Sequence, residues 1–165
     1  MVVLIIAVLA SIVLVSIGHT RKSVNSGACL SQVRQLTMGL RQYAVDNKQM
    51  MPDPSVSGVS WAQSIQSYVG DPAIFACPGD MEVFPLTGLS YDWRDTGDPS
   101  TTMAGRLFDQ VTRTSAILTF ESLPSWHAEG KINAGWIDGS THTMDETACF
   151  KDLLTPVRLE TRNTP

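Results

Sequence analysis

The chain of 165 residues lacks a basic patch, internal repeats and low-complexity runs. It contains 12 Lys and Arg against 16 Asp and Glu, with a net charge of −4, so nucleic acid is not expected as a partner. The absence of internal repeats excludes a repeat protein. What remains is a length suited to one globular domain that follows a distinct first segment.

That first segment is apolar from Met1 to Ile17 and is interrupted only by two serines. As a helix it would span about 25 Å, slightly less than the roughly 30 Å of a hydrocarbon core. A secretory signal peptide stays open, but it would have a basic start, and no charge precedes this run. A lipoprotein signal cleaved at "SGAC" also stays open, although Ser26 stands where a large aliphatic residue is usual. We interpret residues 1–20 as an uncleaved membrane helix.

The charges that flank this segment, Arg21 and Lys22, lie on its carboxyl side. The positive-inside tendency would then leave the main domain in the cytoplasm.

The sequence next becomes amphipathic, within residues 21–52. Apolar residues recur there at spacings of three and four, which places them on one stripe of a helix. Pro52 and Pro54 end the pattern. Such a stripe needs a sheet or other helices to cover it. The residues expected to pack are Leu30, Val33, Leu36, Leu40 and Tyr43.

The rest of the chain predicts short elements. A helix is expected over residues 60–69 and strands over 89–93, 116–120 and 133–137, with another strand after an Asp-Gly turn. The segment "DLLTPVRL" is expected as a terminal helical turn or a strand. The predicted fold class is α+β, with a long N-terminal helix packed on a small antiparallel β-sheet.

This fold divides the chain into three parts. They are a membrane half of the helix (1–20), an amphipathic half (21–52) and a globular α+β head (53–165).

The segment "HAEGKINAGWIDGSTH" contains residues that could bind a metal or take part in catalysis. His127, Asp138 and His142 match no common metal-binding spacing. Cys77 or Cys149 could form a nucleophilic pair with His127, but no nucleophile signature surrounds either cysteine. We therefore predict no catalytic residue, no metal site and no enzyme activity.

Three acidic residues leave calcium open as a cofactor, because the ligands of calcium are oxygens. They are Asp92, Asp95 and Asp98, and their pattern is not that of the regular calcium-binding loop. No other cofactor is expected.

We interpret the same histidine-containing segment as a strand. Because strand side chains alternate, Asn133, Gly135 and Ile137 are expected on one face and Ala134 and Trp136 on the other. Trp136 is large enough to cover part of the apolar helical stripe, so it is predicted on the helix side of the sheet.

The strand is predicted to end in a tight turn at Asp138-Gly139, where glycine supplies a positive φ and aspartate caps its own backbone. We expect Gly139→Val to damage folding, because a β-branched residue is disfavoured at positive φ. We expect His127→Ala and His142→Ala to leave stability nearly unchanged.

Six motifs occur along the chain in a specific order and spacing: "VVLIIAVLASIVLV", "CLSQVRQLTMGLRQYAVDN", "FACPGD", "LSYDW", "AILTFES" and "NAGWIDGS". In this order the chain resembles the type IV pilin-like proteins, in particular a bacterial prepilin-like group with a C-terminal signature of His followed at a distance by Asp-Gly. The matching structural positions are Pro78, Asp80, Tyr91, His127, Asn133, Trp136, Asp138 and Gly139.

Two features depart from that group. Ten residues separate His127 from Asp138, one more than the usual interval. The processing signature, a Gly followed by Phe-Thr-Leu-Ile-Glu, is absent, and Met1 falls a few residues after its expected glutamate. We therefore expect further N-terminal residues with a basic leader. That leader would hold the N-terminus in the cytoplasm and resolve the conflict over orientation.

The resemblance implies a pilin-like helix and a structural role. The chain is predicted to be a pilin-like or pseudopilin subunit of a filament or a type II secretion-like pseudopilus. Its expected partners are other pilin-like subunits and inner-membrane lipid. Its expected location is the inner membrane as a single-pass protein with a periplasmic head, or a cell-surface filament.

The alternative functions are a membrane-anchored binding module that does not polymerise and a membrane-tethered hydrolase.

The chain has three cysteines, which fit an oxidising compartment. Cys29 and Cys77 match the two cysteine positions of the group, so the resemblance implies a disulfide between them. Other pairings with Cys149, and three reduced thiols, stay open.

Overall fold

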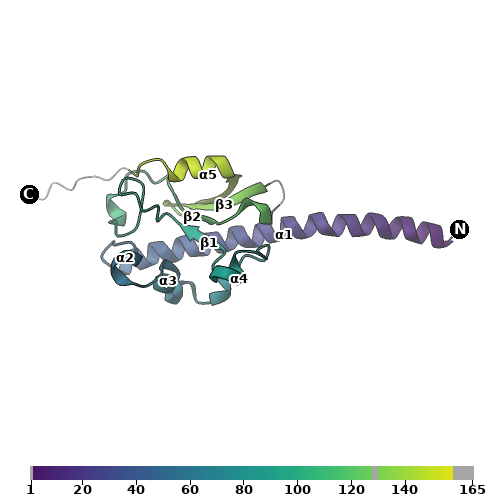
Figure 1. Cartoon of the computed structure of the whole chain (residues 1–165), viewed down its shortest axis with the longest axis horizontal. Helices are drawn as coiled ribbons and strands as arrows, with labels where there is room; N and C mark the ends of the chain where they lie inside the picture. The colour runs from purple at the N-terminus through teal and green to yellow at the C-terminus, as the bar shows by residue number, and fades with distance from the viewer. Residues whose placement is uncertain (1, 128–129, 158–165) are drawn as a thin grey trace, which may run out of the picture.

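The computed structural model describes residues 2–127 and 130–157, with side chains described at Ile6 and from Ser23 onward. Along the chain, helices come first, then four strands with two short 3-10 helices between them, then a last helix (Figure 1). Their bounds are α1 (Val2–Asp46), α2 (Pro54–Ser57), α3 (Trp61–Val69), η1 (Pro72–Phe75), α4 (Phe84–Thr87), β1 (Tyr91–Trp93), η2 (Phe108–Gln110), β2 (Ile117–Glu121), η3 (Pro124–Trp126), β3 (Lys131–Trp136), β4 (Thr141–Asp145) and α5 (Glu146–Leu153).

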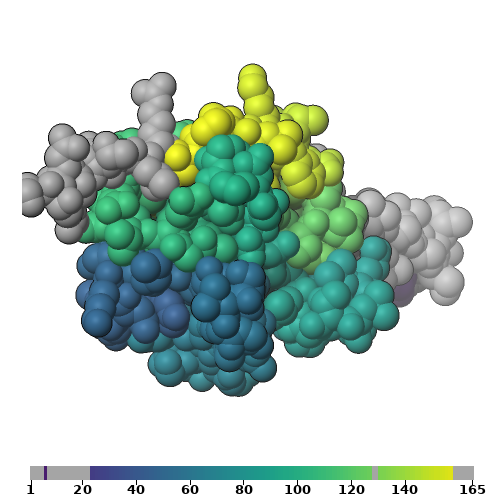
Figure 2. Space-filling model, turned by 60° about the vertical axis from the view of Figure 1, so that its left-hand side comes forward, coloured from purple at the N-terminus to yellow at the C-terminus, as the bar shows by residue number. Residues whose placement is uncertain are grey.

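The four strands form one antiparallel sheet in the order β1-β2-β3-β4. The sheet lies between α1 on one face and α5 on the other (Figure 1). In the space-filling view, α5 (yellow) forms the top of the visible face and the region of α2 and α3 (blue) its lower part (Figure 2). The architecture is therefore α+β, with helices on both faces of a small sheet.

The face of α1 that packs on the sheet is the stripe that the sequence predicts. Val33, Leu36 and Leu40 are all fully buried, and each such side chain contributes about 1.5–3 kcal/mol by leaving water. Leu30 and Tyr43 are only half-buried at the margins of the stripe. The buried stripe is completed by Cys29, Thr37, Gly39 and Ala44.

Helix α3 covers another side of α1 at close range. A Cβ added at Gly39 would lie 2.7 Å from Cγ1 of Val69, so a larger residue would require the side chain of Val69 or the helix to shift. The helix predicted over residues 60–69 is present as α3, with Trp61 and Ile65 buried and Val69 half-buried. Ser60 caps the helix together with Gln63 in a capping box.

A second, smaller core lies between the sheet and α5. Ile132, Ala134 and Trp136 of β3 pack there with Cys149 and Leu153 of α5. Asn133, Gly135 and Ile137 face α1, since Asn133 bonds Ser26, Gly135 lies against Thr37, and Ile137 belongs to the α1-side core. The predicted alternation along β3 is confirmed, but the predicted placement of Trp136 on the α1 side is wrong.

The reason for this error is that a second helix covers the sheet. The segment predicted as a terminal turn or strand begins within α5, whose apolar side chains bury the face that carries Trp136. The ring of Trp136 also lies edge-on to that of His142, with centroids 5.2 Å apart.

The turn after β3 is confirmed. Gly139 has φ +92°, and Asp138 Oδ1 accepts a hydrogen bond from the backbone N–H of Ser140 at 2.8 Å. A Cβ added at Gly139 would lie 2.5 Å from a guanidinium nitrogen of Arg41, the end of a flexible side chain that can move away, so φ is the main constraint at this position.

Across the part of the chain that the structure describes, none of the helices combines the length and apolar character that a membrane crossing requires. The prediction that residues 1–20 form a membrane-spanning half of the N-terminal helix is therefore wrong. The predicted location, a single-pass protein of the inner membrane, is wrong for the same reason. A crossing needs about 20 consecutive apolar residues. Among the side chains of α1 that the structure describes, Arg34, Gln35 and Gln42 are polar and exposed. The side chains of the apolar run 1–17, apart from Ile6, lie outside the described ones.

Candidate functional site

A buried disulfide joins α1 to the loop after η1. Cys29 and Cys77 have Cα atoms 5.5 Å apart and are separated by 48 residues in sequence. The pairing implied by the resemblance is thus confirmed, and Cys149 is a free, buried thiol. Restricting the unfolded chain by a loop of this size corresponds to about 4 kcal/mol of stabilisation in the chain-entropy model.

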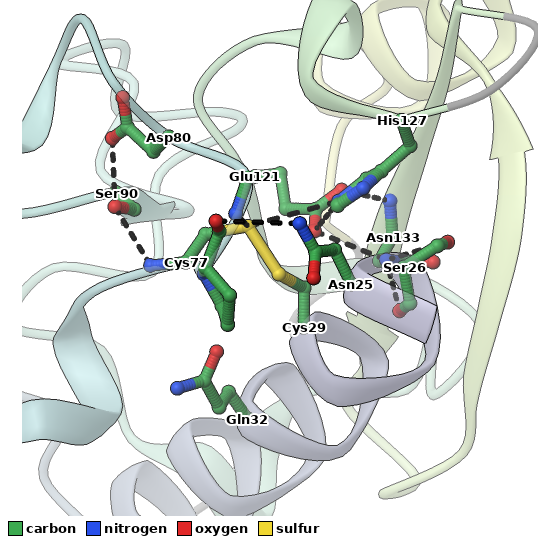
Figure 3. The surroundings of a disulfide bond; sticks show 12 residues. Asn25, Ser26, Cys29, Gln32, Cys77, Asp80, Ser90, Glu121, His127 and Asn133 are labelled. Carbon is green, nitrogen blue, oxygen red and sulfur yellow. Dashed lines mark hydrogen bonds and ion pairs between the residues drawn. A yellow bond between two sulfur atoms is a disulfide. The ribbon is translucent and has the colours of Figure 1, made fainter. Parts of the chain in front are cut away.

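A histidine and a carboxylate lie directly beside the disulfide (Figure 3). Nε2 of His127 is 2.7 Å from Oε1 of Glu121 and 3.8 Å from Sγ of Cys77. Glu121 is the last residue of β2 and is fully buried, and His127 follows η3 and is 4% exposed. An ionisable pair is thus held against sulfur in the protein interior.

Asn133 of β3 fixes the carboxylate of Glu121 from the other side. Its backbone N–H donates to Oε2 at 2.7 Å and its side-chain Nδ2 donates to Oε1 at 3.0 Å. The same Nδ2 bonds the carbonyl oxygen of Ser26 on α1, and the hydroxyl of Thr143 on β4 donates to Oδ1 of Asn133. We call Cys29, Cys77, Glu121, His127 and Asn133 the disulfide cluster.

The ring of His127 uses only one of its nitrogens in this network. Among the described residues, its Nδ1 is buried without a hydrogen-bond partner. Gly79 lies close to the ring, since a Cβ added there would be 3.5 Å from Cε1 of His127.

The loop that carries Cys77 is held by Asp80. Its two carboxylate oxygens accept hydrogen bonds from the Ser90 hydroxyl at 2.7 Å and from the backbone N–H groups of residues 82–84 at 2.8 Å each. Ser90 in turn accepts the backbone N–H of Cys77 at 2.9 Å. Burial would raise the pKa of Asp80, but the bonds from Ser90 and the backbone outweigh it and lower that pKa.

Two further positions of the matched motifs bond α1. The hydroxyl of Tyr91 donates to Gln32 at 2.6 Å, and the carbonyl oxygen of the exposed Pro78 accepts from Asn25 at 3.3 Å. Burial raises the pKa of Tyr91, and the charges of Glu121 and Asp80 raise it further, so the phenol keeps its proton.

The disulfide cluster brings together ligand types that sequence spacing did not connect. One sulfur from each cysteine, an oxygen of Glu121 and a nitrogen of His127 all lie within 4.8 Å of one another. Within the described residues, this is the one group of three or more potential metal ligands. "AILTFES" contains Glu121, but the pairing of β2 with β3 brings Asn133 to it, and the loop after η3 brings His127.

The other candidate residues are apart from this cluster. His127 and Asp138 lie beyond opposite ends of β3, which spans six residues or about 20 Å, and His142 is exposed on β4. Asp92, Asp95 and Asp98 each accept a local hydrogen bond, from Trp93, Thr102 and Ser100.

The structure also places the two candidate nucleophiles, Cys77 and Cys149. Cys77 is next to His127, but its sulfur is in the disulfide. Cys149 is on the buried face of α5, where burial and the charge of Asp152 raise its pKa to about 12.

A second buried charge was missed by sequence reasoning. Arg94 is fully buried, and its guanidinium donates to Asp152 at 2.9 Å and to the carbonyl oxygens of Thr101, Ile117, Leu153 and Thr155. Arg113 also pairs with Asp152. We call Arg94, Arg113 and Asp152 the Arg94 cluster. No local pattern in "YDWRD" distinguishes this arginine from a surface one.

No protein family, curated protein or solved structure matches the chain. The resemblance to the pilin-like proteins therefore stays a prediction.

Proposed function

We propose that the chain is a non-catalytic structural subunit, similar to the pilin-like proteins, that assembles with other subunits through α1. The observation that carries this proposal is a second, unused face of α1. One face of the helix is buried against its own head, and the opposite face has exposed apolar side chains. Val24, Met38 and Val45 are 64%, 51% and 56% exposed.

These three residues share one side of the helix. At 3.6 residues per turn, separations of 14 and 7 residues keep them within about 60° of one another. The residues between them on this side are mainly small or uncharged, namely Gly27, Ala28, Ser31, Gln35 and Gln42, and the exposed, charged Arg34 lies at one edge of the same side. Helices associate through such surfaces by close van der Waals contact and side-chain hydrogen bonds. Figure 1 shows that the N-terminal part of α1 runs beyond the edge of the sheet.

The attachment of α1 to the head suits a subunit that transmits load. The disulfide, the bonds of Asn133 to Ser26 and of Tyr91 to Gln32, and the buried stripe all tie the helix to the sheet and loops. A disulfide is typical of proteins that reach an oxidising compartment.

The test is the assembly state of the full chain, measured by sedimentation velocity and negative-stain electron microscopy. We expect oligomers or filaments from the wild type and monomers from the triple variant Val24→Asp/Met38→Asp/Val45→Asp. The matched control is Val56→Asp/Leu86→Asp, two changes at exposed apolar positions of the head, which should assemble normally. A wild type that stays monomeric at every accessible concentration, or a triple variant that still assembles, would overturn the proposal.

A further inference from the structure

Four side chains around the disulfide have the composition of a zinc site. Cys29, Cys77, Glu121 and His127 come from four separate parts of the fold: α1, the loop after η1, the end of β2 and the loop after η3. Their ligand atoms all lie within 4.8 Å of one another, and the residues are at most 4% exposed. Figure 3 shows Glu121 and His127 on the same side of the two sulfur atoms.

We propose that, when this disulfide is reduced, the two thiolates, Glu121 and His127 bind one zinc ion. Zinc prefers thiolate sulfur, imidazole nitrogen and carboxylate oxygen, and its structural sites have four ligands in a tetrahedron. Bonds of about 2.0–2.3 Å imply distances of roughly 3.3–3.8 Å between ligand atoms.

The observed geometry is close to that requirement. Nε2 of His127 and Sγ of Cys77 are already 3.8 Å apart. The contact of 2.7 Å between His127 and Glu121 has to open by about 0.6 Å to reach the lower end of that range. The two sulfurs separate when their bond is broken.

A disulfide alone does not account for these neighbours. It is uncharged and needs no hydrogen bond, whereas burying a carboxylate and an imidazole beside it has a desolvation cost. Asn133 holds Glu121 through a backbone and a side-chain bond, which is how residues behind a metal site orient its ligands.

The chemistry balances with a dithiol as the reductant. The protein disulfide takes two electrons and two protons from the dithiol, which becomes a disulfide itself. On binding zinc, each cysteine releases its proton. His127 binds through Nε2, so the proton between Nε2 and Oε1 of Glu121 leaves this contact. It moves to Nδ1 if the ring is neutral, and it is released to solvent if Nδ1 already has a hydrogen. The oxidised chain and the zinc-bound chain are then two alternative ways of linking α1 to the loop after η1.

The test uses the full chain, reduced and freed of reductant under nitrogen, and titrated with Co²⁺ as a spectroscopic substitute for zinc. We expect one equivalent to bind, with thiolate-to-cobalt absorption and the strong visible bands of tetrahedral cobalt, and Zn²⁺ should displace it. The oxidised chain should show neither band. Far-ultraviolet circular dichroism of the reduced chain, with and without zinc, reports whether the fold is kept.

Variants separate the proposed ligands from other thiols. Cys149→Ser is the matched control and should bind cobalt like the wild type, whereas Cys29→Ser/Cys77→Ser should lose the thiolate bands. Glu121→Gln and His127→Gln should each weaken zinc binding by at least about tenfold, as measured by competition with a chromogenic chelator.

A reduced wild type without cobalt–thiolate bands would overturn the proposal, whether or not it stays folded. So would a Cys149→Ser chain that loses them, or a Glu121→Gln or His127→Gln chain whose affinity is unchanged. Because this readout is metal binding by the single chain, it is independent of the assembly measured above.

Discussion

Two fully buried charges, Glu121 and Arg94, lie toward opposite ends of the β1–β2 pair, and they are satisfied in different ways. Glu121 pairs in register with Tyr91 at one end, and the backbone N–H of Arg94 bonds the carbonyl of Leu118 toward the other. The partners of Glu121 are mainly side chains, His127 and Asn133. The guanidinium of Arg94 donates mostly to backbone carbonyls.

This difference indicates which of the two clusters can exchange its hydrogen bonds for other ligands. Backbone carbonyls are fixed by the fold, and the guanidinium of Arg94 has its Nε and both terminal nitrogens engaged. The Arg94 cluster is therefore a structural clamp that joins the end of β1 to the C-terminal end of α5 and the loop after it. In the disulfide cluster the partners are side chains with ligand atoms directed at one another, so they can exchange a hydrogen bond for another ligand.

The largest expected effect is at the structural clamp. Arg94→Ala leaves Asp152 and several carbonyl oxygens without their buried donor, which should cost about 3–5 kcal/mol of unfolding free energy. Arg113→Ala removes a partly exposed partner of the same carboxylate and should cost less than about 1 kcal/mol. Urea denaturation of both variants and the wild type measures the difference. Equal losses would show that the comparison between the two arginines is wrong.

Removing the disulfide is the next largest change. Cys29→Ser/Cys77→Ser should lower the unfolding free energy of the oxidised protein by about 2–4 kcal/mol, because the unfolded chain is no longer closed into a loop. The control Cys149→Ser should change it by much less, and the native thiol should resist alkylation, since its pKa is raised to about 12. Thermal and urea unfolding provide the measurement, with thiol titration as a check on the oxidation state. A stability loss for Cys149→Ser as large as that of the double variant would contradict this ranking.

Substitutions of the two histidines should differ clearly in their effect on the unfolding free energy. His127→Ala leaves the buried carboxylate of Glu121 without one partner and should cost about 1–3 kcal/mol. His142→Ala, at an exposed position, should stay within about 0.5 kcal/mol of the wild type. The structure thus reverses the expectation of a harmless change at His127 and keeps it at His142. Denaturant unfolding of the two variants measures the difference. An unchanged unfolding free energy for His127→Ala would show that the disulfide cluster is not a stabilising network.

The smallest expected effect is on how the unfolding free energy changes at acidic pH. Because the pKa of Asp80 is lower in the folded than in the unfolded chain, its ionised form stabilises the fold above the unfolded value of about 3.9. This contribution is lost as pH falls through the lower, folded pKa. We expect the unfolding free energy of Asp80→Asn to fall less steeply between about pH 5 and pH 2 than that of the wild type. Identical slopes in urea denaturation across this range would contradict the assignment.

Much of the local structure is predictable from the sequence. The stripe of Val33, Leu36 and Leu40, the short helix at 61–69, the strands and the turn at Asp138-Gly139 all depend on residues a few positions apart. Periodicity and turn chemistry act over that range, so the sequence predicts these elements with small errors in their bounds. The disulfide partner of Cys29 came from resemblance to a protein group, because three cysteines alone allow three pairings.

The sequence by itself determined that the side chains of β3 alternate between two faces, and that α1 has one stripe to bury. Only the tertiary structure decided which helix covers which face, and so placed Trp136 beneath α5 and Asn133 beside α1. It also decided that Glu121 and His127 meet at the sulfurs of Cys29 and Cys77. The physical reason is that alternation and helical period fix directions within one element. The contacts of a buried charge depend on how separate elements pack, and residues as far apart in sequence as Cys29 and His127 become neighbours only through that packing.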